Sequence, residues 1–177
     1  MRRADEFSDR GPSDPQRVFE VLHAHGVDFV VIGGFAVISH GHVRVTNDVD
    51  FVASTAAENL RRLEAALLEL KAELWGVDAH LLGIELDAET LASGANFTLI
   101  TDAGGVDLFN EVPGGAPYEE LRERALLVEV EGLPIRVAGL DDLLRMKRFA
   151  GRPRDIEDIA VLTEQEAKGE QEGPTDT

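Results

Sequence analysis

Two aspartates stand one residue apart in the segment HGHVRVTNDVDFV, residues 40–52. In a β-strand, residues i and i+2 face the same side with Cα atoms about 6.7 Å apart, so Asp48 and Asp50 would crowd two negative charges. At roughly 6 Å and an effective dielectric of about 20, their repulsion is about 3 kcal/mol. A divalent cation removes this penalty, and Mg²⁺ prefers carboxylate and phosphate oxygens. The pair predicts half of a metal–phosphate site, against the plain alternative of two exposed strand or turn residues.

A third carboxylate is a candidate for the same site. Asp107 stands between Val106 and Leu108 in an apolar segment with the composition of a neighbouring strand. A buried charge with apolar neighbours needs a partner. Together with Asp48 and Asp50, it would form a triad suited to two metal ions about 3.5–4 Å apart.

The residues before the aspartates suggest a place for an anion. Gly33 and Gly34 follow the β-branched run VVI and precede an apparent helix, where glycines let a ligand approach the backbone and free N–H groups can bind it. Arg44 and Thr46 follow, and the arginine fork suits a phosphate. The plain alternatives are an ordinary strand–helix turn and a surface arginine paired with local acids.

Alternating and helical patterns predict an α/β (α+β) fold, with helices flanking a small mixed sheet. The strongest helix signal covers 55–74, where Thr55 and Glu58 match a capping box. Other helices are expected at 14–25, 35–41, 87–94, 117–125, 140–151 and 155–167. Strands are expected at 27–34, 47–54, 95–101 and 104–112, with a hairpin over 126–139.

One domain is expected over residues 14–165, and its C-terminal helical part, about 139–165, would complete the site. Residues 1–13 and the acidic residues 166–177 are expected to be disordered. The chain has no cysteine, which excludes a disulfide framework and a thiolate metal site. It has no long apolar stretch and no signal-peptide core, so no membrane association and a cytoplasmic location are expected.

The charge of the chain limits its partners. Of 177 residues, 34 are acidic and 17 are Lys or Arg, giving a net charge of −17. Proteins that bind nucleic acid non-specifically need a basic face, so the composition argues against a large surface of this kind. A local basic pocket remains compatible with it.

Two segments together resemble a known superfamily. GGFAVISHGHVRVTNDVDFV is similar to the signature of polymerase-beta-type nucleotidyltransferases in its glycine-pair form, which leads into R-x-T-x-D-x-D. LDDLLRMKRFAGRPRDIEDIAVL resembles the C-terminal pattern of the AbiEii-like group, which includes toxins of type IV toxin–antitoxin systems. Without this resemblance, Lys147 would be a solvated residue of an amphipathic helix.

The resemblance implies a nucleotidyltransferase fold and an enzyme that transfers a nucleoside monophosphate from an NTP to an acceptor hydroxyl, with Mg²⁺ or Mn²⁺. The implied catalytic residues and metal ligands are Asp48, Asp50 and Asp107. The implied nucleotide-binding residues are Gly33, Gly34, Arg44, Thr46, Lys147, Arg152 and Asp155. Two departures from the pattern are the Gly-Gly-Phe sequence where many members have Gly-Ser, and Arg154 in place of a lysine.

The implied partners are an NTP, an RNA, tRNA or protein acceptor, and a cognate antitoxin. A compact basic patch would reconcile an RNA acceptor with the acidic composition; its residues would be Arg44, Lys147, Arg148, Arg152 and Arg154. Two alternatives stay open. One is a transferase that modifies an antibiotic or another small molecule, and the other is a nucleotide-binding module with weak catalysis.

Overall fold

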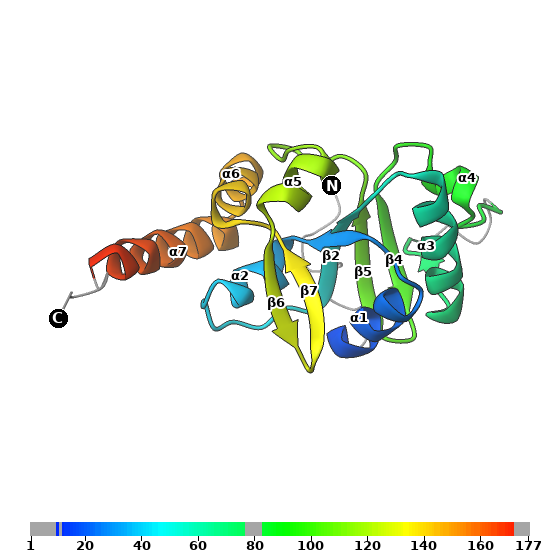
Figure 1. The fold of residues 1–177 in the computed structure, drawn as a ribbon, viewed down its shortest axis with the longest axis horizontal. Coiled ribbons are helices and arrows are strands. Elements are labelled where there is room, and N and C mark those ends of the chain that lie inside the picture. Colours follow the sequence, from blue (N-terminus) through cyan, green and yellow to red (C-terminus); the bar gives the residue numbers. More distant parts are fainter. Residues whose placement is uncertain (1–9, 11, 77–82, 172–177) are drawn as a thin grey trace.

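The fold is a seven-stranded mixed sheet with helices packed against it (Figure 1). The structure is a computed structural model and describes residues 10, 12–76 and 83–171. The strand order is β3-β4-β5-β2-β1-β7-β6. The strands are β1 (Phe29–Val31), β2 (Asp48–Ala53), β3 (Glu73–Leu74), β4 (Phe97–Thr101), β5 (Gly104–Phe109), β6 (Leu126–Val130) and β7 (Leu133–Val137). The helices are α1 (Pro15–Ala24), α2 (Gly33–Ser39), α3 (Ala57–Glu69), α4 (Ala88–Leu91), α5 (Tyr118–Arg124), α6 (Leu140–Ala150) and α7 (Pro153–Gln171). The mixed α/β fold expected from the sequence is confirmed.

The central strand β2 positions the predicted carboxylates. It pairs antiparallel with β1 and parallel with β5, and Asp50 lies opposite Asp107 in the register. Because side chains alternate along a strand, Val49 and Phe51 enter the large core on one face. The aspartates of β2 therefore point to the opposite face of the sheet.

Each face of the sheet has its own hydrophobic core. The larger core packs α1 and α3 against the sheet and contains the fully buried Phe19 and Leu63. The smaller core joins Val30 and Val52 of the sheet to Leu121 of α5 and Met146 of α6. A fully buried side chain of this size contributes roughly 1.5–3 kcal/mol. The smaller core thus fixes α5 and α6 on the same face as the aspartates.

The helix expected at 55–74 is wrong at both ends. Its N-cap is Ala56, whose side chain cannot cap, so the capping box is also wrong. At the other end α3 stops at Glu69, Lys71 takes a φ of 51°, and Glu73–Leu74 pairs with β4. Leu70 and Leu74 fit the helical spacing, but Leu70 is the C-cap of α3, buried in the larger core, and Leu74 pairs with Leu99 of β4. The helix therefore ends where this long-range strand pairing begins.

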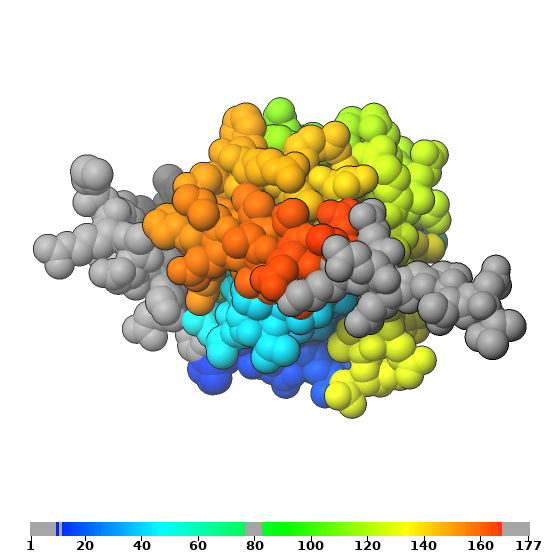
Figure 2. All heavy atoms as spheres, turned by 90° about the vertical axis from the view of Figure 1, so that its left-hand side faces the viewer, coloured from blue at the N-terminus to red at the C-terminus, as the bar shows by residue number. Residues whose placement is uncertain are grey.

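The last helix is longer than the sequence indicates. α7 continues to Gln171 and includes the first part of the segment 166–177 that the composition predicts to be disordered. Figure 1 shows it extending away from the sheet, and Figure 2 shows it lying between α6 and the α2–β2 segment. Gln165 binds the carbonyl oxygen of Gly41 at 3.1 Å. In the described part of the chain, no helix has the length and apolar character needed to cross a membrane.

Candidate active site

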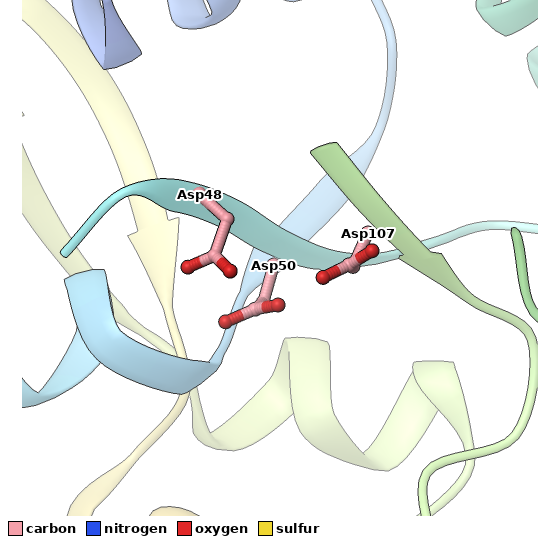
Figure 3. A group of neighbouring side chains, drawn as sticks. All are labelled: Asp48, Asp50 and Asp107. Atoms are coloured by element: carbon pink, nitrogen blue, oxygen red, sulfur yellow. The ribbon is translucent and has the colours of Figure 1, made fainter. Parts of the chain in front are cut away.

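Three carboxylates converge on one face of the sheet. Asp48 and Asp50 come from β2, Asp107 comes from β5, and each offers an oxygen within 4.8 Å of the others (Figure 3). Two oxygens bound to one Mg²⁺ at about 2.1 Å are about 3 to 4.2 Å apart, so small side-chain rotations would bring the three onto one ion. The all-oxygen donor set fits a hard divalent cation. Among the described residues, no other group of His, Asp or Glu meets the same criterion.

Asp50 is electrostatically strained by its surroundings. Its burial, followed by the charges of Asp48 and Asp107, raises its pKa from 3.8 to about 7. A backbone hydrogen bond from Gly34 and the charge of Arg10 act in the opposite direction and are smaller. Two interacting carboxylates in one site cannot both ionise easily. The triad therefore gains a large electrostatic benefit from a bound cation.

The glycine pair is required by close contacts with the site. Gly33 has a φ of 61°, and a Cβ there would lie 1.9 Å from Oδ2 of Asp50. A Cβ on Gly34 would lie 2.5 Å from Oγ1 of Thr46 and 2.8 Å from the Arg44 guanidinium. Both glycines are the first residues of α2 and do not precede the helix as the sequence suggests. They bring backbone directly against the carboxylates and leave no room for a side chain.

Gly34→Ala is expected to weaken binding of a magnesium–nucleotide complex about tenfold or more, because the new methyl group displaces Thr46 and Arg44 from the pocket wall. Isothermal titration with Mg-ATP and Mg-GTP measures the effect. Ser39→Ala, a substitution on the same helix, is the matched control. Unchanged affinity in a folded Gly34→Ala variant would contradict the role of this glycine.

Lys147 is buried in an ionic cluster. Its Nζ lies 3.0 Å from Oδ1 of Asp155 and 2.7 Å from Oδ2 of Asp158, and the residue is 5% exposed. The interpretation of Lys147 as a solvated residue is therefore wrong. Both carboxylates come from α7, so the pairs fasten the last helix to α6.

The same cluster reaches the loop before β2. Oδ1 of Asp158 lies 3.1 Å from Nε of Arg44 and 3.2 Å from Nδ1 of His42. Asp158 is fully buried, so it faces these groups with no solvent screening. Sequence reasoning assigned Asp158 no role, because an acid in the first turn of a helix is explained by the helix dipole alone. The signal that could have found it is the second aspartate of DIED in the C-terminal motif.

Asp155 caps the start of α7. It accepts hydrogen bonds from the backbone N–H and from Nε of Arg152, at 3.1 and 2.7 Å. Burial alone would raise the pKa of Asp155, but the hydrogen bonds from Arg152 and Lys147 outweigh it and the pKa is lowered. Asp155 therefore remains charged and holds Arg152 at the pocket edge.

All ten catalytic and nucleotide-binding residues proposed from the sequence line one pocket of about 600 Å³. They are Gly33, Gly34, Arg44, Thr46, Asp48, Asp50, Asp107, Lys147, Arg152 and Asp155. Sequence reasoning missed the apolar part of the wall, which includes Val112, Met146 and Phe149. It also missed Arg10, which was placed in a segment expected to be disordered and instead binds two of the three aspartates.

Several solved structures are similar to this one in fold. The antibiotic-resistance factor ANT(2'')-Ia matches with a TM-score of 0.56 and 13% identity, over 84% of this chain and 80% of that one. A Thermotoga maritima protein assigned to the nucleotidyltransferases matches with a TM-score of 0.51 and 16% identity, over 85% and 91%. An antigenic nucleotidyltransferase-like protein from Paracoccidioides brasiliensis matches with a TM-score of 0.50 and 17% identity, over 86% and 78%. At these identities the similarity establishes the fold.

The sequence itself identifies the family. Residues 16–164 match the family described as nucleotidyltransferase of unknown function (DUF6036), and the chain belongs to this family. No curated protein matches the sequence. The superfamily expected from the motifs is confirmed, whereas the narrower resemblance to the AbiEii-like group stays a prediction.

Proposed function

We propose that the protein transfers a nucleoside monophosphate from an NTP to an acceptor hydroxyl, in a reaction that requires Mg²⁺ or Mn²⁺. The observation that carries this proposal is the convergence of Asp48, Asp50 and Asp107 beside the Gly33–Gly34 backbone, in a pocket that also has cationic groups. A divalent cation bound there would neutralise phosphate charge and lower the pKa of the acceptor hydroxyl.

The residues of the chain position an in-line displacement. The acceptor oxygen forms a bond to the α-phosphorus while the bond from that phosphorus to the bridging β-oxygen breaks, and pyrophosphate leaves. Asp107, on the strand next to the other two carboxylates, takes the hydroxyl proton. Arg44, Lys147 and Arg152 offset the charge of the triphosphate. Catalysis of this kind depends on positioning and electrostatics.

The two walls of the pocket suit the two parts of a nucleotide. The cationic wall faces the phosphates. The apolar wall offers a surface for the base, with Phe149 at its edge. Phe149 is 68% exposed, yet it is seated closely on Gly114, where a Cβ would lie 2.4 Å from the Cβ of Phe149. An exposed aromatic ring at the edge of the pocket offers a face on which a base can stack.

The arrangement of the cationic side chains favours a small acceptor, such as a cationic molecule with free hydroxyls. Arg44 and Lys147 are turned inward onto Asp158 and therefore do not add to an outer basic patch. The patch that would reconcile an RNA acceptor with the charge of −17 is smaller than the sequence suggests. ANT(2'')-Ia, which shares the fold, has been solved with adenylyl-2''-tobramycin.

A toxin of a type IV toxin–antitoxin system is the second candidate, with an RNA, tRNA or protein acceptor and a cognate antitoxin. It is favoured by the C-terminal motif, whose Lys147, Asp155 and Asp158 form one ionic cluster next to the pocket.

Incubation with each of the four NTPs, labelled at the α-phosphate, tests the reaction and its acceptor. Parallel samples contain Mg²⁺ and a panel of aminoglycosides, total RNA, or protein extract. We expect label on a small molecule, and label on RNA or protein would support the second candidate. If no acceptor gains label above the level of an Asp48→Asn/Asp107→Asn variant, the proposed transfer is wrong.

A further inference from the structure

An arginine from the N-terminal end of the described chain lies in the carboxylate site. Arg10 donates from one guanidinium nitrogen to Oδ1 of Asp107 and from the other to Oδ2 of Asp107 and Oδ2 of Asp48, each at 2.9 Å. The first nitrogen also donates to the carbonyl oxygen of Leu99 at 3.2 Å. Arg10 is only 5% exposed. This is a paired, charge-assisted contact of the kind that is strong in proteins.

The backbone of β5 is shaped to receive this segment. A Cβ on Gly105 would lie 2.7 Å from Nε of Arg10, and a Cβ on Gly104 would lie 2.9 Å from the carbonyl oxygen of Pro12. The backbone N–H of Asp14 then donates to the carbonyl oxygen of Ala103 at 2.8 Å. Two adjacent glycines and a backbone hydrogen bond thus accommodate the Arg10 side chain and residues 12–14, which lead into α1. The contact between Arg10 and the carboxylates is supported by this arrangement.

We propose that Arg10 is a built-in competitor for the divalent cation, so that Arg10 must leave the triad before the metal–nucleotide complex can bind fully. This inference rests on the proposed function, since it concerns the metal that the reaction would use. The guanidinium takes the oxygens of Asp48 and Asp107 that a cation shared by these residues needs. Asp50 receives none of these hydrogen bonds, so its carboxylate can accept a cation first.

Competition of this kind makes the resting protein self-inhibited. A buried guanidinium holds two acids in place without catalysing transfer, because it cannot coordinate a phosphate oxygen as a metal ion does. Binding of the cation and release of Arg10 are then thermodynamically coupled, so each favours the other.

Mn²⁺ binding to the full-length protein tests the exchange directly. Arg10→Ala is expected to bind Mn²⁺ about tenfold or more tightly than the wild type in isothermal titration, since no hydrogen bonds to the triad must break. Arg17→Ala is the matched control, because Arg17 pairs with the exposed Glu69 away from the site. Equal Mn²⁺ affinities of the wild type and Arg10→Ala would overturn the inference.

Trypsin cleavage after Arg10 is a second readout, independent of activity. The burial of Arg10 should protect this bond in the wild type, and Mn²⁺ should accelerate cleavage there several-fold while leaving other tryptic sites unchanged. Asp107→Asn should expose the same bond without metal. A cleavage rate unaffected by Mn²⁺ or by Asp107→Asn would show that Arg10 does not exchange.

The outcomes separate this inference from the proposed function. If label transfer occurs but Arg10→Ala changes neither Mn²⁺ affinity nor cleavage, only the inference fails. If Arg10 is released by Asp107→Asn but no variant binds Mn²⁺, the metal requirement of the proposed function fails, and the competition fails with it.

Discussion

Asp50→Asn is expected to reduce nucleotidyl transfer at least about 100-fold and, in the same protein, to raise the melting temperature. In metal sites, even replacing a residue that only hydrogen-bonds a metal ligand reduces affinity or activity about 10- to 100-fold, and Asp50 is itself one of three converging carboxylates. The amide keeps the shape of the side chain and removes its charge. Transfer from an α-labelled NTP at saturating Mg²⁺ measures the loss.

The gain in stability follows from the sign of the pKa shift. The pKa of Asp50 is about 7 in the folded protein, above its ordinary value of 3.8, because of burial and the charges of Asp48 and Asp107. Between these two values the folded state holds more protons than the unfolded state, so stability falls as the pH rises from about 4 to about 7. Above about pH 7 this loss of stability is complete and no longer changes with pH. Asp50→Asn removes the loss, so the melting temperature of the variant should exceed that of the wild type by a few degrees at pH 8 and by little at pH 4.

Thermal unfolding in the presence of a chelator checks this prediction, with Asp102→Asn as the control for a lost surface charge. Asp102 is exposed at the turn between β4 and β5. If the Asp50→Asn variant melts at a lower temperature than the wild type at pH 8, the charge of Asp50 does not destabilise the folded protein, and the prediction is wrong.

Local signals predicted the elements of the fold well. Capping by Asp14, with Pro15 in the first turn, starts α1, and Gly151 in a left-handed conformation ends α6. The hairpin turn at Glu131 and Gly132 has positive φ at both residues, as a tight two-residue turn requires. These features depend on neighbours in the chain, so the sequence is sufficient to place them.

Features that depend on distant residues were missed. Strand β3 exists because Glu73 and Leu74 pair with β4, and its two residues have no pattern of their own. Arg10 belongs to a polar segment whose composition predicts disorder, and its partner Asp107 is 97 residues away. The sequence was enough to propose the three carboxylates, but it did not indicate that the Arg10 guanidinium binds two of them.

The ionic cluster around Asp158 shows why the site residues could be proposed but their partners could not. Arg44 and Lys147 were assigned to phosphates from a motif, which gives residue types but no contacts. The structure places Asp158 between them, with ionic contacts of 3.1 and 2.7 Å. The carboxylate therefore positions both cations, and it links α7 to the loop before β2 through Arg44 and to α6 through Lys147.

Asp158→Asn is accordingly expected to lower the free energy of unfolding by about 3–5 kcal/mol, because it leaves buried cations with an uncharged neighbour. For a chain of this length, the melting temperature should fall on the order of 10 °C. Nucleotide affinity should fall as well, since Arg44 and Lys147 lose the group that orients them. Chemical denaturation and thermal unfolding measure the first effect, and titration with a magnesium–nucleotide complex measures the second.

The exposed neighbour Glu157 provides the matched control, because Glu157→Gln removes one acid from the same turn of α7 without touching the cluster. Lys147→Met tests the coupling: if Lys147 and Asp158 act as a pair, Asp158→Asn should destabilise the Lys147→Met protein less than it destabilises the wild type. Arg44 still faces the altered site in the double variant, so part of the loss should remain. A melting temperature of Asp158→Asn within about 2 °C of the wild type would mean that the buried carboxylate does not hold α7 in place.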